Sequence, residues 1–395
     1  MQKYYPYLIT LSHMINYSCQ SVLPALLPLF IYTYGLSLEQ AGFLILANTA
    51  LSSLLQPLLG YISDKLNQPR LIAAGTLLSA CSTGMMGFVS SYESLLVCAT
   101  LAGVGSSIFH PEGAKIMNRL GGGKKGKAMG TFAIGGSSGF AFGPLFAGAI
   151  AYTVGAHGLA AFTVAGIIIS TVLFLLMPRI VAHAQTIDQA VATENPTVAA
   201  QPLKNYWKYF GILFIIILSQ SVNFRVINAF IPVFWTHELG TSPEQGSFAL
   251  TVFFSIGIFM TYIGGLLGDK YGPIKIIRLS LLIWLPSMFL LTQVPEFSVT
   301  IMMPLAYLIL LMIGAAKAIS YSPVIVLGQT YLAKSIGFAS GITLGVSQTI
   351  GGIIAPVVGN LADTYSLPAA MMTLVPFLIV GLVASLLLKD PKKLQ

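Results

Sequence analysis

The stretch Gly60-Tyr-Ile-Ser-Asp64-Lys65 recurs 205 residues later as Gly265-Leu-Leu-Gly-Asp269-Lys270. The same offset pairs an upstream set of residues: Gly35 with Gly240, Ser37 with Ser242, Glu39 with Glu244, Gln40 with Gln245, and Phe43 with Phe248. One fixed offset over two separate stretches indicates that the chain consists of two repeated halves. Repeated halves are typical of secondary transporters, in which two helical bundles rock about a binding site near the middle of the membrane.

The composition indicates a membrane protein. Of the 395 residues, 55% are hydrophobic and only 8% are charged, against about 25% charged in a typical soluble domain. This composition excludes a soluble enzyme. The formal net charge of +8 comes from basic residues scattered singly between apolar runs. We therefore expect no nucleic-acid partner, and we interpret these residues as signals that orient the chain in the lipid bilayer.

Apolar stretches predict an all-α membrane protein with twelve transmembrane helices. A membrane-spanning helix needs about 20 mostly apolar residues. Stretches of this kind lie near 5–33, 38–62, 71–90, 94–118, 127–152, 158–178, 207–235, 244–268, 273–292, 298–321, 323–360 with a break near Lys334, and 366–388. The total is twelve if residues 323–333 form the end of the tenth span.

The longest polar interruption divides the chain into three parts. We expect an amino-terminal six-helix bundle over 1–178, a cytoplasmic linker over 179–205 without clear helical periodicity, and a carboxy-terminal six-helix bundle over 206–395. Of the 20 Lys and Arg residues, all but Arg225 and Lys317 fall on one side of this arrangement. The positive-inside rule then places both termini in the cytoplasm, in a multi-pass protein of the bacterial cytoplasmic membrane.

The repeated Gly-x-x-x-Asp-Lys resembles the loop motif of the major facilitator superfamily. Its members here are Gly60, Asp64 and Lys65, and Gly265, Asp269 and Lys270. The resemblance implies a twelve-helix major facilitator fold, in which this motif latches the outward-facing state. The alternative is that Asp and Lys only mark a helix end at the membrane interface.

A second motif lies in the predicted span 127–152. The run Gly130-x8-Gly139-x3-Gly143-Pro144-x2-Ala147-Gly148 looks like the antiporter motif of the superfamily's exporters, with Ala147 in place of one glycine. Glycines four residues apart remove side chains from one helix face, so that helices pack closely, and Pro144 adds a kink. The resemblance favours export, whereas the alternative is ordinary packing of small residues.

Three stretches of the amino-terminal half resemble the fosmidomycin-resistance family of this superfamily. They are Gly103-Val-Gly105-Ser106-Ser107-Ile-Phe109-His110-Pro111-Glu112, Leu11-Ser12-His13 followed by Asn16 and Gln20-Ser21, and Leu55-Gln56-Pro57. The resemblance implies a drug/proton antiporter. Tyr17 stands where the family has an Asp, and Ala99 where exporters usually have an Arg, so the proton-carrying role of that Asp does not transfer.

Ionisable residues within spans are costly and are therefore functional candidates. Glu112 is the one acid predicted within a span, and we expect it to carry the coupled proton, with His13 and His110 as further titratable groups. A helix-end ion pair of Glu112 with Lys115 is the alternative. His13, Asn16 and Gln20 form one polar stripe, which lines a water-filled cavity or makes interhelical hydrogen bonds.

Two cations in the carboxy-terminal half predict an anion site. Arg225 shares a stripe with Asn228, and Lys317 lies in the tenth span. With one acid available at depth, these cations would attract an anion. Lys317 could instead extend to the membrane interface, and either cation could neutralise Glu112. Asn16, Gln20, Arg225, Asn228 and Lys317 are thus the substrate-binding candidates.

Other features narrow the function further. The chain lacks a phosphate-binding loop and the hydrolase motifs, so we expect no enzyme activity, no cofactor and no metal, and a proton gradient as the energy source. Cys19, Cys81 and Cys98 all lie in apolar stretches.

We predict a proton-coupled exporter of a small, anionic drug or metabolite, with a fosmidomycin-like phosphonate as the family's example. A proton-linked importer of an organic anion, a metabolite or metallophore efflux pump with incidental drug resistance, and a non-transporting receptor or scaffold are the alternatives, and the oligomeric state is not predicted.

Overall fold

The computed structural model describes residues 2–66, 68–122, 125–194, 204–335, 339, 342–343 and 347–391. These residues are almost entirely helical, with an isolated antiparallel bridge between Asn205 and Leu332. Within this part of the chain, eight helices are long and apolar enough to cross a membrane, and a bent helix pair makes a ninth span. Helices suit lipid because they satisfy their own backbone hydrogen bonds.

The helices of the first half follow the predicted spans, with one exception. In chain order they are η1 (Gln2–Tyr4), α1 (Tyr5–Ala25), α2 (Leu27–Tyr34), α3 (Leu38–Leu66), α4 (Leu71–Met85), α5 (Tyr92–Gly121), α6 (Lys125–Val154), η3 (Ala156–Leu159) and α7 (Ala160–Glu194). The bent pair is α1 and α2, which meet at 47°.

The exception is α7, which continues to Glu194, well past the predicted start of an irregular linker at residue 179. Residues 179–194 show no clear helical periodicity in the sequence, but tertiary contacts hold this part of the helix. Ile180 and Ala184 are buried in a hydrophobic cluster, and Arg119 Nε of α5 lies 2.8 Å from Asp188 Oδ2. Packing of one helix face often outweighs weak periodicity.

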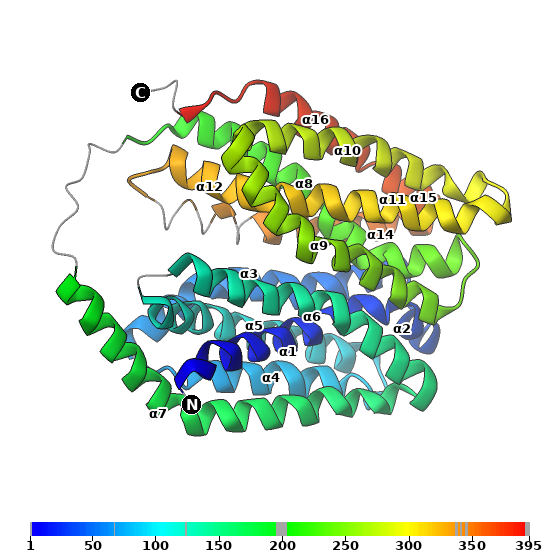
Figure 1. Ribbon diagram of the computed structural model, residues 1–395. Helices are drawn as coiled ribbons and strands as arrows, with labels where there is room; N and C mark the ends of the chain where they lie inside the picture. The colour runs from blue at the N-terminus through cyan, green and yellow to red at the C-terminus, as the bar shows by residue number, and fades with distance from the viewer. Residues whose placement is uncertain are drawn as a thin grey trace. The chain divides into compact units, whose positions relative to one another are not determined.

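The second half contains α8 (Trp207–His237), α9 (Pro243–Tyr271), α10 (Pro273–Gln293), η4 (Val294–Glu296), α11 (Val299–Ile319), α12 (Tyr321–Tyr331), α14 (Ser347–Thr364), α15 (Leu367–Met372) and α16 (Val375–Leu386). α11 packs against α9 and α10 (Figure 1). α11 and α12 form one span over Thr300–Tyr331. Residues 321–331 therefore continue the tenth predicted span, which is the condition under which the sequence predicts twelve spans.

The internal repeat produces the same local structure twice. Gly35 and Gly240 both adopt left-handed backbone conformations, with φ of 61° and 62°. Two residues later, Ser37 and Gln40 exchange backbone-to-side-chain hydrogen bonds at the start of α3. Ser242 and Gln245 do the same at the start of α9. Each turn therefore ends one helix with glycine and begins the next with a capping box.

By packing, the chain divides into two units. Unit 1 is Met1–Leu23 with Ala47–Gln201, and unit 2 is Pro24–Leu46 with Pro202–Gln395. Within unit 2, the first turn of α3 rests on α14. Asp363 accepts the Leu38 N–H at Oδ1 (2.8 Å) and the Glu39 N–H at Oδ2 (2.9 Å). Asn360 Nδ2 donates to Glu39 Oε2 (2.9 Å).

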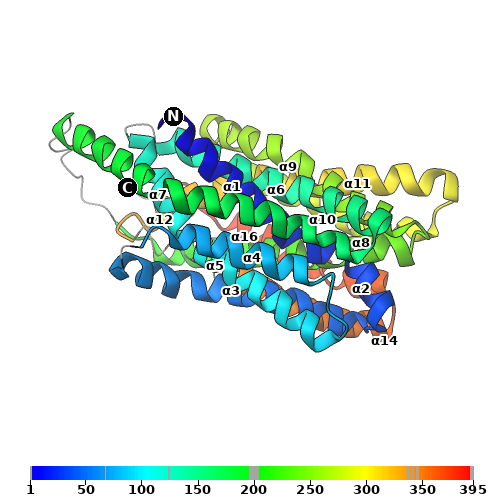
Figure 2. The same ribbon diagram turned by 90° about the horizontal axis from the view of Figure 1, so that it is seen from below.

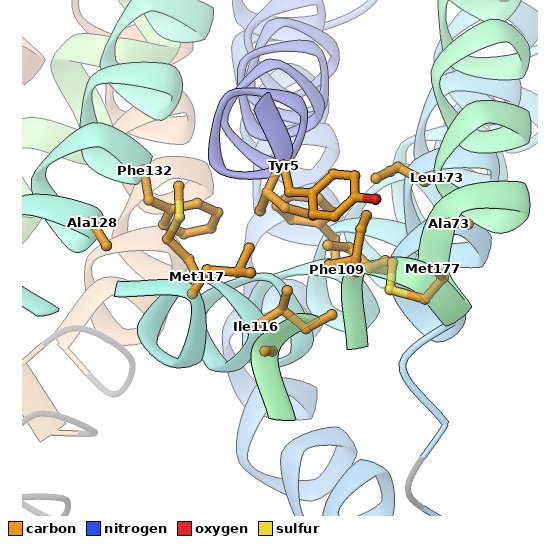
Figure 3. Close-up of a cluster of buried hydrophobic side chains, with 14 of the residues drawn as sticks. Tyr5, Ala73, Phe109, Ile116, Met117, Ala128, Phe132, Leu173 and Met177 are labelled. Atoms are coloured by element: carbon orange, nitrogen blue, oxygen red, sulfur yellow. The ribbon is translucent and has the colours of Figure 1, made fainter. Parts of the chain in front are cut away.

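The core of unit 1 is a cluster of large apolar side chains (Figure 3). Phe109 and Met117 of α5, Phe132 of α6, and Leu173 and Met177 of α7 belong to it. α4 packs against both α5 and α7 (Figure 1). In lipid, close van der Waals packing of such side chains helps to hold the helices of the unit together.

The glycines of the predicted antiporter motif differ in what they contact. α1 runs along α6 (Figure 2), and Gly139 and Gly143 of α6 meet the backbone of Met14 and Ser18. A side chain on Gly130, by contrast, would meet no atom within 4 Å. Pro144 lies within the continuous helix α6. Close helix packing therefore explains two of the motif's glycines, and Gly130 lies where no described atom approaches.

Candidate functional site

A cavity of about 40 Å³ in unit 2 lies between α8 and the α11–α12 span. Its polar and aromatic lining consists of Gln220, Ser221 and Phe224 from α8, Lys317 from α11, Ser320, Tyr321 from α12, and Thr343. Lys317 lies well inside the span Thr300–Tyr331. This position does not match a lysine that extends to the membrane interface.

Aromatic rings hold the ammonium of Lys317. Its Nζ lies 4.5 Å from the centroid of the Phe224 ring and 5.0 Å from that of Tyr321. The Arg225 guanidinium carbon lies 5.8 Å from the same Phe224 ring. Cation–π contacts stabilise a cation without neutralising it. Two positive groups therefore share one aromatic side chain.

The described lining of the cavity includes no Asp or Glu. The positive charge is thus not cancelled by an acid of the cavity wall. Gln220 adds a donor, because its Oε1 accepts from Ser320 Oγ (3.4 Å) while its Nε2 has no hydrogen-bond partner among the described residues. A cation, a free amide N–H and hydroxyls in one cavity are the groups that bind an oxyanion.

A glycine on α14 makes room for Arg225. A Cβ at Gly351 would lie 2.7 Å from Ser221 O and 3.1 Å from Arg225 Cγ. α14 and α8 thus pack closely at this point. Asn228, the other candidate on α8, is buried but is not among the residues that line the cavity.

Sequence reasoning did not identify Gln220, Phe224, Tyr321 or Gly351. A signal for two of them was present, because Phe224 adjoins Arg225, and Tyr321 follows Lys317 by four residues. Residues four apart lie on one face of a helix. Gly351 comes from a distant helix, and its role depends on how α14 packs.

The polar stripe of α1 makes contacts between helices of unit 1. His13 Nδ1 lies 2.7 Å from Phe132 O of α6. Asn16 Oδ1 accepts from Ser106 Oγ of α5 at 2.9 Å, and Gln20 Nε2 donates to Ala102 O of α5 at 3.0 Å. Interhelical hydrogen bonding, one of the two alternatives, is therefore what these side chains do in the structure.

The structure brings His13 and His110 together. Their ring centroids are 5.3 Å apart, and the ring planes meet at 83°. His110 Nδ1 lies 2.7 Å from Ser106 O, and the Tyr17 ring packs against both imidazoles, at 4.7 Å and 4.9 Å. Gly136 of α6 leaves space for His13 and Tyr17, since its Cβ would lie 2.7 Å from His13 Cε1 and 2.9 Å from Tyr17 Cδ2.

Glu112 has a neighbouring counter-ion. Its side chain is buried, and its Oε1 lies 3.6 Å from Lys115 Nζ, one helical turn along α5. This geometry supports the ion-pair alternative for Glu112. Its role as the proton carrier remains a prediction.

Of the two copies of the Asp-Lys motif, the structure describes the side chains of the second copy. The side chains of Gly60, Asp64 and Lys65 in α3 lie outside the described part of the structure. Gly265, Asp269 and Lys270 lie in the last turns of α9, where Asp269 and Lys270 are exposed and Lys270 Nζ is 5.1 Å from the Tyr271 ring. The latch role of the motif remains a prediction.

Family models place the chain in a known group of proteins. The model of the Major Facilitator Superfamily matches residues 9–212 and again 213–395. The chain is 30% identical over 366 residues to the fosmidomycin resistance protein of Escherichia coli K12, covering 91% of this chain and 86% of that protein. It is 29% identical to the uncharacterized MFS-type transporter YfnC of Bacillus subtilis (98% and 94%). It is 24% identical to the hexuronate transporter of Escherichia coli K12 (95% and 90%).

Solved structures show the same fold. A bacterial homologue of the human lysosomal transporter Spinster, in an inward-facing and occupied conformation, matches with a TM-score of 0.75 at 17% identity, over 98% of this chain and 96% of that one. A D-xylose–proton symporter matches with a TM-score of 0.75 at 16% identity and the same coverage. These proteins are transporters, and no catalytic family matches among these findings. The chain belongs to the major facilitator superfamily, and it is an all-α, multi-pass membrane transporter built from two repeated halves.

Proposed function

We propose that the protein is a proton-coupled exporter of a small anionic drug or metabolite, with a fosmidomycin-like phosphonate as the example. It would act in the bacterial cytoplasmic membrane with both termini in the cytoplasm. One observation carries the proposal: Lys317 and Arg225 share the Phe224 ring beside a cavity whose described lining has no acid. Asn16, Gln20 and Asn228 are further substrate-binding candidates.

The energetics favour an anionic ligand. A charged side chain at membrane depth costs several kcal/mol, and two like charges near each other add repulsion. A bound oxyanion reduces both costs because it carries negative charge and accepts hydrogen bonds. The Gln220 amide, whose Nε2 has no partner among the described residues, offers one such bond.

The names of the relatives support an anion more strongly than they support a direction. Fosmidomycin is a phosphonate, and the names of two other relatives specify hexuronate and nitrate. All three compounds are anions. Export rests on the likeness to the fosmidomycin resistance protein and on the glycine pattern of α6. Proton-linked import of an organic anion is the second candidate, favoured by the hexuronate relative. A metabolite or metallophore efflux pump remains an alternative within export.

Coupling needs a group that binds protons. The candidates are Glu112, His13 and His110, all in unit 1. In an antiporter, proton and substrate each favour a different state, and each shifts the equilibrium only by its difference in affinity for the two states. Loss of coupled transport in a folded Glu112→Gln variant would support that residue.

Everted membrane vesicles energised to be acid inside test the proposal. Fosmidomycin, glucuronate and a lipophilic cation are added in turn, and proton release is compared with that of vesicles lacking the protein. We expect proton release with fosmidomycin, and its loss in Arg225→Gln. Lys208→Gln, at the exposed start of α8, is the matched control and should behave as wild type. Release with the cation alone would reject the anion proposal, and release with glucuronate alone would replace the phosphonate with a carboxylate.

A further inference from the structure

The imidazole pair of unit 1 has a defined pattern of hydrogen bonds. A carbonyl oxygen can only accept, so the Nδ1 atom of His13, 2.7 Å from Phe132 O, carries a proton. His110 Nδ1 carries a proton for the same reason, because it lies 2.7 Å from Ser106 O. A neutral imidazole has one N–H, so both Nε2 atoms present lone pairs.

These Nε2 atoms are buried and have no hydrogen-bond partner among the described residues. Asn16 Nδ2, on the same face of α1 as His13, is likewise buried without a partner there. His13 is 5% exposed and Asn16 is 0% exposed. Buried polar groups are almost always hydrogen-bonded, so three open ones in one cluster indicate a missing ligand. The ligand must offer two donors and one acceptor.

We propose that His13, His110 and Asn16 form a proton-binding site, in which a water molecule bridges both Nε2 atoms and accepts from Asn16 Nδ2. A water molecule has two donors and two acceptor lone pairs, which fits the three open groups. A hydronium arriving there transfers its proton to one Nε2, where an N–H bond forms, and remains as the bridging water. The role of the site in transport rests on the proposed antiport, whereas proton binding itself does not.

The site takes a single proton. With ring centroids 5.3 Å apart, two imidazolium ions in a buried place would repel each other strongly. Of the ionisable groups on α1, α5 and α6, Tyr17 packs against both rings, and Glu112, two residues after His110 on α5, has Lys115 as its counter-ion. α6 contributes Phe132, stacked on His13 at 3.9 Å, and Gly136. Asn16 also connects to His110 through Ser106 Oγ, at 2.9 Å and 3.2 Å.

Nuclear magnetic resonance tests proton binding without transport. The chain has five histidines, so nitrogen-15-labelled histidine gives a readable spectrum, and His13→Gln and His110→Gln assign the pair. We expect the ring nitrogens of both residues to change together in one protonation step, and His13→Gln to shift that step in His110. Two independent steps, or no protonation of either ring, would overturn the site.

Proteoliposomes test the coupling role with fosmidomycin as the probe. His13→Gln and His110→Gln should lower gradient-driven transport by about tenfold, a typical coupling factor, while exchange of labelled fosmidomycin without a gradient persists. His183→Gln, on α7 against Tyr5, is the matched control and should keep both activities. Loss of exchange as well would assign the histidines a structural role, and uncoupling in Glu112→Gln instead would move the proton to that acid. Absence of any fosmidomycin transport by the wild type would reject the proposed function but leave the resonance test decisive.

Discussion

The same offset that reveals the repeat also relates the charged positions of the two units. Moving by 205 residues places Gln20 on Arg225 and Glu112 on Lys317. In unit 1 each of these side chains has a partner within the unit. Gln20 donates to Ala102 O, and Glu112 lies beside Lys115. In unit 2 the equivalent positions carry two cations that share an aromatic ring.

We propose that this difference lets one repeated arrangement support two tasks, anion binding and proton binding. The backbone is repeated, as the matching turns at Gly35 and Gly240 demonstrate, but the charges are not. Unit 2 has the groups to bind an anion. Unit 1 has neutral imidazoles with open lone pairs, and we propose that it binds the proton.

Of the substitutions that test this comparison, reversal of the charge at Lys317 should have the largest effect on transport. Lys317→Glu gives unit 2 the side chain found at the equivalent position of unit 1. We expect kcat/KM for fosmidomycin transport to fall by at least about a hundredfold, because the new carboxylate would repel the anion and pair with Arg225, and removal of one partner of a buried charge pair costs about 3 kcal/mol or more. Initial rates in proteoliposomes measure it, with Lys208→Glu as the control. Transport within a few-fold of wild type would show that the anion does not bind at Lys317.

Two glycine substitutions should separate the proposed anion binding by unit 2 from the proposed proton binding by unit 1. Gly351→Ala would crowd Arg225, and Gly136→Ala would crowd His13 and Tyr17. Each overpacked site costs about 1–3 kcal/mol. We expect Gly351→Ala to raise KM with coupling intact, and Gly136→Ala to lower the protons moved per substrate with KM nearly unchanged. Simultaneous measurement of substrate and proton flux distinguishes them. The same phenotype from both variants would mean that the tasks are not divided between the units.

The smallest effect on transport is expected from a substitution of Phe224, whose ring contacts both Lys317 and Arg225. Phe224→Leu keeps an apolar side chain but removes the π face beneath Lys317, a contact of about 0.5–2 kcal/mol. We expect KM to change by about fivefold, and the expressed amount of protein to stay the same. Phe259→Leu, an exposed phenylalanine of α9, is the control. A KM equal to that of wild type would remove the ring from the site.

More of the fold than of the candidate site could be predicted from the sequence. Span positions, the repeat and the break between α12 and α14 all follow from apolar runs and turn residues. The helical extension of α7 could not be predicted, since it depends on Ile180 and Ala184 meeting side chains from other helices. For the same reason His13 and His110 were separate candidates in the sequence. Their pairing depends on the rotation of α1 against α5, which spacing within either helix does not determine.

The start of α3 has a consequence for motion. Its capping box occupies the Gln40 N–H, while Asp363 of α14 holds the Leu38 and Glu39 N–H groups. These bonds are all exposed, so water can take the place of the carboxylate if α14 moves away, while the helix keeps its own cap. Contacts that exchange freely with water cost little to break and to form again. The hydrogen bonds between the start of α3 and α14 can therefore exchange with water without unwinding either helix.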